Sequence, residues 1–110
     1  MSNINHVIDT ERESLKELLG DAIYVVIVLF RDDREVSKEV NDAFLDISNN
    51  AENAVFVEIN SFQDADIFEG FKVTAAPTVV VFKKTKEQAR LTETDKEKFV
   101  KFVKKYVKMK

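Results

Sequence analysis

The chain has 110 residues, of which 45% are apolar, 34% charged and 10% aromatic, and its formal net charge is -3. This length and apolar content predict one folded domain over residues 1–110. The small negative charge provides no general attraction to nucleic acid. The sequence contains no cysteine, which excludes disulfides, thiolate metal sites and thiol redox chemistry within these residues.

No segment of the sequence predicts export or membrane insertion. The apolar runs are shorter than the roughly 18 residues that indicate a spanning helix, and residues 1–6 lack the basic and apolar parts of a secretory signal. The two glycines, Gly20 and Gly70, form no glycine-rich phosphate loop. We therefore expect a cytoplasmic protein that contacts neither membrane nor nucleic acid.

The predicted elements alternate between strands and helices along the chain. A short edge strand is expected over residues 4–8, followed by a helix over residues 10–20 that begins at a capping box and ends near a glycine. Residues 22–30 form an unbroken apolar run, which is typical of a strand buried on both faces. The following helix is expected to begin at Asp32 or Asp33, since a carboxylate suits the positive end of a helix.

The remaining elements are predicted from helical spacing of apolar residues and from short β-branched runs. In chain order they are a helix, a strand, a short helix, two strands and a helix, over residues 36–50, 55–59, 64–71, 78–82, 87–91 and 94–107. Thr94 to Glu97 has the form of a capping box with Thr94 as N-cap. The last helix carries many lysines, and we expect that face to be solvated because its apolar stripe must cover the sheet.

The element order is β-α-β-α-β-α-β-β-α. Parallel strands joined by helical crossovers, followed by a hairpin and a helix, predict an α/β protein with helices on both faces of a mixed central sheet. The expected architecture is a three-layer α/β/α sandwich.

This order resembles the thioredoxin fold over essentially the whole chain. Residues 25–30 are similar to the central strand that leads to the active-site loop of thioredoxins, and residues 71–83 are similar to the segment in which a Pro-Thr pair introduces an apolar strand. The resemblance implies a thioredoxin fold and a cis peptide bond before Pro77. Residues 44–49 and 68–77 also resemble the N-terminal thioredoxin-like domain of multidomain monothiol glutaredoxins. These 110 residues include no glutaredoxin domain, so we expect no iron–sulfur cluster.

The redox loop is where the sequence departs from the thioredoxin pattern. The resemblance places Arg34 and Ser37 at the two cysteine positions, and Val28 at the position of the buried carboxylate. A thiolate is the nucleophile of disulfide exchange, and neither arginine nor serine replaces it at neutral pH. The sequence therefore predicts a scaffold without redox chemistry, since fold alone does not imply function.

The main functional hypothesis is a redox-inactive, non-catalytic domain that binds another protein, with no cofactor and no metal. The candidate partner-binding residues are Asp33, Arg34, Glu35, Ser37, Ala76 and Pro77. The alternative for the first four is a solvated helix start, and the alternative for Pro77 is that it only fixes its loop. We expect the protein to be a monomer or a weak oligomer.

Two other functional hypotheses remain open. One is a thioredoxin-family disulfide oxidoreductase whose cysteines are substituted or lie outside this chain. The other is a docking role in a large complex such as the spliceosome, which includes a thioredoxin-like protein without redox function. A calcium site at Asp32, Asp33 and Glu35 is not expected because the turn lacks calcium-binding spacing.

Overall fold

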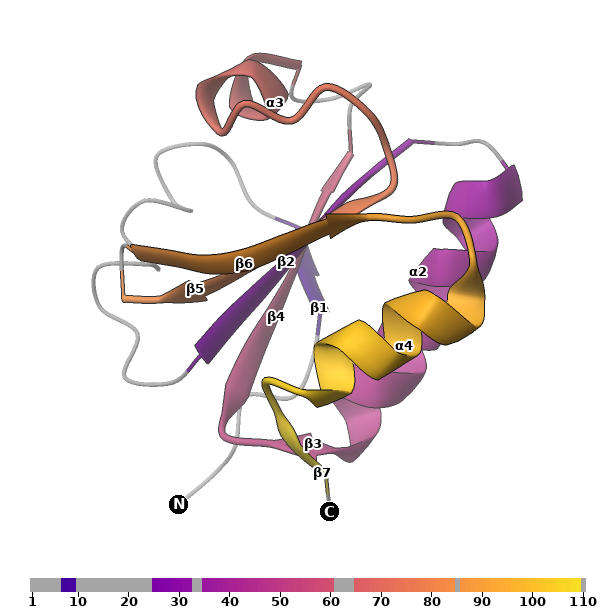
Figure 1. Cartoon of the computed structure of the whole chain (residues 1–110), viewed down its shortest axis with the longest axis vertical. Helices are drawn as coiled ribbons and strands as arrows, with labels where there is room; N and C mark the ends of the chain where they lie inside the picture. Colours follow the sequence, from indigo (N-terminus) through magenta and orange to yellow (C-terminus); the bar gives the residue numbers. More distant parts are fainter. Residues whose placement is uncertain (1–6, 10–24, 33–34, 61–64, 85, 110) are drawn as a thin grey trace.

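The main sheet has five strands and is mixed (Figure 1). The computed structural model describes residues 7–9, 25–32, 35–60, 65–84 and 86–109. In spatial order the strands are β1 (Val7–Asp9), β4 (Ala54–Asn60), β2 (Val25–Arg31), β5 (Thr78–Lys83) and β6 (Lys86–Thr92). β1, β4 and β2 are parallel, and β5 and β6 are antiparallel to their neighbours. The mixed sheet and the edge position of the first predicted strand are confirmed.

Helices cover both faces of this sheet. α2 (Glu35–Asn50) and α4 (Lys96–Lys104) lie side by side on one face (Figure 1). α3 (Ala65–Gly70) and the segment after it pack Phe68 and Phe71 against the other face. The three-layer architecture is therefore confirmed. The helix predicted over residues 10–20 lies outside the described residues, as do residues 4–6 and 22–24 of the predicted strands.

In the described part of the chain, no helix combines the length and the apolar character that crossing a membrane requires.

β2 is buried on both faces, as its apolar run predicts. Residues 26–30 have no exposed surface, and because side chains alternate along a strand they divide between two cores. The α3-side core consists of Val26, Val28, Phe30, Val55, Val57, Ile59, Val73, Val80 and Phe82. The α2-side core consists of Ile27, Leu29, Val40, Phe44, Ile47, Ala51, Ala54, Phe56, Val79, Val81, Phe99 and Val103.

Aromatic pairs join the helices to the sheet. Phe30 of β2 meets Phe68 of α3 edge to face, with 5.3 Å between ring centroids. On the other face, Phe44 of α2 lies 5.2 Å from Phe56 of β4 and 6.2 Å from Phe99 of α4. Such pairs contribute about 0.5–1.5 kcal/mol each beyond their buried area. They fix the positions of α2, α3 and α4 relative to β2 and β4.

The N-cap of α4 is Asp95, so the prediction of Thr94 was wrong. Asp95 has extended backbone angles, and its Oδ1 accepts from the backbone N–H groups of Glu97 at 2.9 Å and Lys98 at 3.3 Å. The carboxylate of Glu93 accepts from the N–H groups of Thr94 and Asp95, both at 3.1 Å. Two carboxylates therefore accept from four backbone N–H groups at and just before this helix start, where the dipole also favours negative charge.

A second, two-stranded sheet was not predicted. β3 (Ala51–Glu52) pairs antiparallel with β7 (Lys108–Met109). α4 accordingly ends at Lys104, earlier than its apolar stripe suggested, and the chain turns back to reach β3. The side chains of Tyr106 and Val107 still pack against the α2-side core from this turn.

The C-terminus of α3 is closed by a Schellman motif with lysine in the left-handed position. Lys72 has φ 58°. Its N–H donates to the carbonyl of Glu69 at 3.0 Å, and the N–H of Val73 donates to the carbonyl of Phe68 at 2.8 Å. Val73 and Phe68 also meet in the α3-side core, which is the apolar contact typical of this motif.

We expect the substitution Lys72→Gly to stabilise the fold. Glycine adopts positive φ without the steric cost of a Cβ atom, so the free energy of unfolding should rise by about 0.5–1 kcal/mol after the entropic cost of glycine is subtracted. Urea denaturation measures the change. The control is Lys72→Ala, which removes the long side chain but keeps Cβ. An equal gain in the alanine variant would contradict this explanation.

Candidate functional site

The topology brings the two predicted site segments to one end of the sheet. β2 and β4 finish there together, with Arg31 paired in register with Asn60. β5 begins at the same end, where Thr78 lies opposite Phe30 of β2. The loop that precedes Thr78 therefore lies at the end of the sheet where β2 finishes. We call this region the carboxyl end of the sheet.

The predicted site residues are described to different extents. Asp33 and Arg34 lie outside the described residues. Glu35 and Ser37 belong to the first turn of α2. Pro77 is buried, and the Ala76–Pro77 peptide bond is cis, which is the isomer that the resemblance implies.

Hydrogen bonds from Thr78 hold the loop before β5 in place. Its Oγ1 lies 2.7 Å from the carbonyl oxygen of Ala75 and 2.7 Å from the hydroxyl of Thr92 on β6. A hydroxyl has one proton, so Thr78 donates to Ala75 and accepts from Thr92. The N–H of Glu93 donates to the carbonyl of Pro77 at 3.3 Å. Carbonyl groups on both sides of Ala76 are thus engaged inside the protein.

The same loop presents small side chains to solvent. Thr74 and Ala75 are exposed, and Ala76 is half-buried. Short side chains permit the backbone of another chain to approach closely. The loop therefore offers a surface of fixed shape, and the sequence prediction missed the role of Thr78 and Thr92 in fixing it.

A charged pair lies beneath this end of the sheet. Glu58 is only 8% exposed, and the Nε of Arg31 donates to its Oε1. The Nη1 of Arg31 also donates to the carbonyl of Asp32 at 3.3 Å. Asp32 is the first residue after β2. The pair connects β2 to β4 and fixes the direction in which the chain leaves β2. Glu58 is the one charged residue in the apolar sequence of β4. Because a buried carboxylate requires a cation or several donors, this position indicates an ion pair from the sequence alone.

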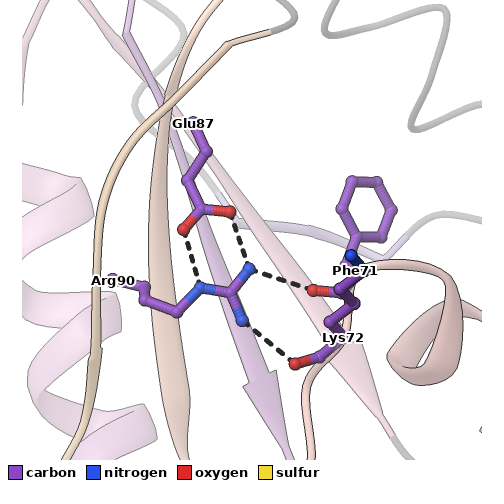
Figure 2. Close-up of polar contacts among 4 residues, drawn as sticks. All are labelled: Phe71, Lys72, Glu87 and Arg90. Carbon is purple, nitrogen blue, oxygen red and sulfur yellow. Dashed lines mark hydrogen bonds and ion pairs between the residues drawn. The ribbon is translucent and has the colours of Figure 1, made fainter.

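Arg90 of β6 holds the segment that leads from α3 to the loop (Figure 2). Its guanidinium donates to the carbonyl of Phe71 at 3.0 Å and to that of Lys72 at 3.2 Å. The carboxylate of Glu87 orients it through two further bonds, of 2.7 Å to Nε and 2.6 Å to Nη2. Arginine suits this role because its planar group donates in several fixed directions.

Glu87 and Arg90, together with the two carbonyl groups that Arg90 binds, form what we call the Arg90 clamp. The two charged side chains shift each other's pKa. The hydrogen bond from Arg90 lowers the pKa of Glu87, and the same bond raises the pKa of Arg90. Both side chains are about a third exposed, so solvent screens the pair and its contribution to stability is small. The clamp was not visible in the sequence because Arg90 and Phe71 belong to different elements.

No metal site is found at this end in the described ranges, and the buried carboxylate there, Glu58, is held in an ion pair with Arg31. No three acidic or histidine side chains come together there or elsewhere in those ranges. Val28, at the position where the resemblance implies a carboxylate, is fully buried in the α3-side core. The described groups at this end can form hydrogen bonds, ion pairs and apolar contacts.

Solved thioredoxin structures share this architecture. A mutant thioredoxin from Halobacterium salinarum has a TM-score of 0.82 and 13% identity, covering 100% of this chain and 98% of that chain. Thioredoxin F from spinach chloroplast has a TM-score of 0.84 and 10% identity, covering 96% and 97%. Malassezia sympodialis thioredoxin has a TM-score of 0.80 and 19% identity, covering 96% and 92%. No protein-family model and no curated protein matches the sequence. These likenesses establish that the chain has the thioredoxin fold.

We expect the contribution of Glu87 to depend on pH. Its pKa is lowered in the folded state, so the stabilisation is present at neutral pH and is lost as the pH falls through that lowered pKa. Glu87→Gln should therefore reduce the free energy of unfolding at pH 7 by about 0.2–1 kcal/mol, the range of exposed pairs. The deficit should be smaller at about pH 3, which lies below the ordinary pKa of glutamate, because part of the stabilisation is lost there.

Urea denaturation of both proteins at the two pH values measures this difference. Glu39→Gln on α2 is the matched control, because Glu39 is exposed and forms no ion pair with a described residue. A deficit of Glu87→Gln that stays constant between the two pH values would contradict the assignment.

Proposed function

We propose that this chain is a redox-inactive module that binds a partner polypeptide at the carboxyl end of the sheet. The observation that supports it is the loop of residues 74–77, which Thr78 and Arg90 hold from both sides and in which Thr74 and Ala75 are exposed and Ala76 is half-buried. The start of α2 lies at the same end. The polar contacts are assigned to Asp33, Arg34, Glu35 and Ser37 on the basis of the sequence, and Ala76 supplies the apolar contact, while the buried Pro77 holds the shape of the loop.

The absence of cysteine supports the redox-inactive part of the proposal. Thiol–disulfide exchange proceeds through a mixed disulfide between enzyme and substrate. None of the 110 residues is a cysteine, so none can form that intermediate. Arg34 and Ser37 occupy the corresponding positions, and the buried Val28 supplies no proton acceptor.

An extended segment of the partner fits this surface best. A partner strand beside residues 74–76 would meet a backbone that carries only small side chains. The carbonyl groups of Ala75 and Pro77 already accept internal hydrogen bonds, so recognition depends on shape and on side chains more than on ladder pairing of the kind seen in β-augmentation. The charged residues of the loop between β2 and α2 would select the polar residues of the partner.

We expect the double substitution Arg34→Ala and Ala76→Leu to weaken partner binding by about tenfold or more, the effect of losing a central contact. A partner is first identified by capture with the wild-type protein from its own cells. Its dissociation constant is then measured by titration calorimetry for wild type and variant, with circular dichroism to confirm the fold.

Lys86→Leu is the matched control, since Lys86 is exposed at the other end of β6 and its replacement should leave the dissociation constant unchanged. Equal binding by the wild type and the double variant would show that the partner uses another surface.

We expect no disulfide reductase activity from the wild-type chain. In an insulin reduction assay with dithiothreitol, its rate should equal that of the reductant alone. The double substitution Arg34→Cys and Ser37→Cys should accelerate the reaction, because it places two thiols where the fold resembles the dithiol enzymes. Acceleration by the wild-type protein would contradict the proposed function.

A further inference from the structure

A cavity between α2 and α4 lies apart from the proposed partner surface. Its volume is about 300 Å³. Its floor is apolar and is formed by Ile47 of α2, Val100 of α4 and Met109 of β7. The unpredicted pairing of β7 with β3 brings Met109 to this position. The cavity is large enough to receive one or two side chains from another molecule.

The two walls of this cavity carry opposite charges. Asp42 and Asp46 form the wall on α2, and Lys96 and Lys104 form the wall on α4. All four side chains are exposed. No ion pair among the described residues joins the two walls, so each charge is available to a molecule outside. The walls together have no net charge.

This arrangement selects the chemistry of the occupant. A uniformly acidic or basic partner would be attracted to one wall and repelled by the other, whereas a partner with both charges, separated as the walls are, complements the two. The chain itself carries such a surface on this same pair of helices. We call the cavity and its two charged walls the α2–α4 groove, which runs between the two helices. A two-fold axis along the groove would place α2 of one copy over α4 of the other, so that each acidic wall faces a basic wall. An axis across the groove would place like charges together.

We propose that the α2–α4 groove is the contact surface of a weak homodimer whose two-fold axis runs along the groove. The two cavities face each other across the axis, and four crossed pairs of aspartate and lysine join their walls. Exposed ion pairs contribute more to orientation and partner choice than to affinity. The dimer is therefore expected to dissociate at low protein concentration and at high salt. This inference does not depend on the proposed function, since Asp42 and Asp46 lie two to three turns after the start of α2.

Charge exchange tests the proposal. In the variant Lys96→Glu with Lys104→Glu both walls are acidic, and in the variant Asp42→Lys with Asp46→Lys both walls are basic. Sedimentation equilibrium of the wild type should show an average mass that rises from one chain toward two with concentration. Each variant alone should dimerise at least about tenfold more weakly, because like charges then face each other. An equimolar mixture of the two variants should recover dimers, which also shows that both variants are folded.

The matched control is Lys98→Glu with Lys105→Glu. It makes the same change of charge at exposed residues that do not line the groove, and it should dimerise as the wild type does. A wild-type protein that stays monomeric at the highest attainable concentration would overturn the proposal. This holds even if a peptide of another protein binds the groove. A dimer that survives in both charge variants would also overturn it, because it would use another surface.

Discussion

The burial of β2 on both faces is the constraint on which the rest of the structure depends. Residues 26–30 have no contact with solvent, so the strand is stable only between two apolar layers. Helices must therefore cover both faces, and β4 and β5 must flank it to satisfy its backbone groups. The end of this strand determines where the chain emerges, and thus where any site at the carboxyl end is built.

Polar contacts at that end serve to hold backbone in place. The buried pair of Arg31 and Glu58 fixes the exit from β2, Thr78 fixes the loop before β5, and Arg90 holds the segment after α3. Removing one member of a buried pair leaves the other unsatisfied, which costs more than the pair contributes. This end of the sheet is thus shaped with precision although the chain has no thiol. Such a surface suits recognition, where fixed shape lowers the entropic cost of binding.

The two surfaces proposed for interaction differ in origin. The loop of residues 74–77 is fixed by hydrogen bonds of Thr78 to Ala75 and Thr92. The α2–α4 groove arises from exposed charges on two helices and from the position of Met109. The proposed partner surface includes the start of α2, whereas the groove uses Asp42 and Asp46 further along that helix. A dimer through the groove therefore leaves the loop of residues 74–77 accessible. A dimer would then present two loops, and it would bind a partner with two copies of the recognised segment more tightly than one chain does.

The sequence alone determined the five strands of the main sheet, the helices α2, α3 and α4, their order and the absence of thiols. These follow from local properties, such as the apolar run that forms β2, the helical spacing in α2 and the absence of cysteine. Tertiary structure decided what depends on residues that meet across the fold. The pairing of β3 with β7, the contact of Arg90 with Phe71 and the opposite walls of the groove join segments far apart in the chain. The choice of Asp95 over Thr94 as N-cap rests on the extended backbone of Asp95 and on the two N–H groups that its side chain reaches, and no periodicity in the sequence encodes these.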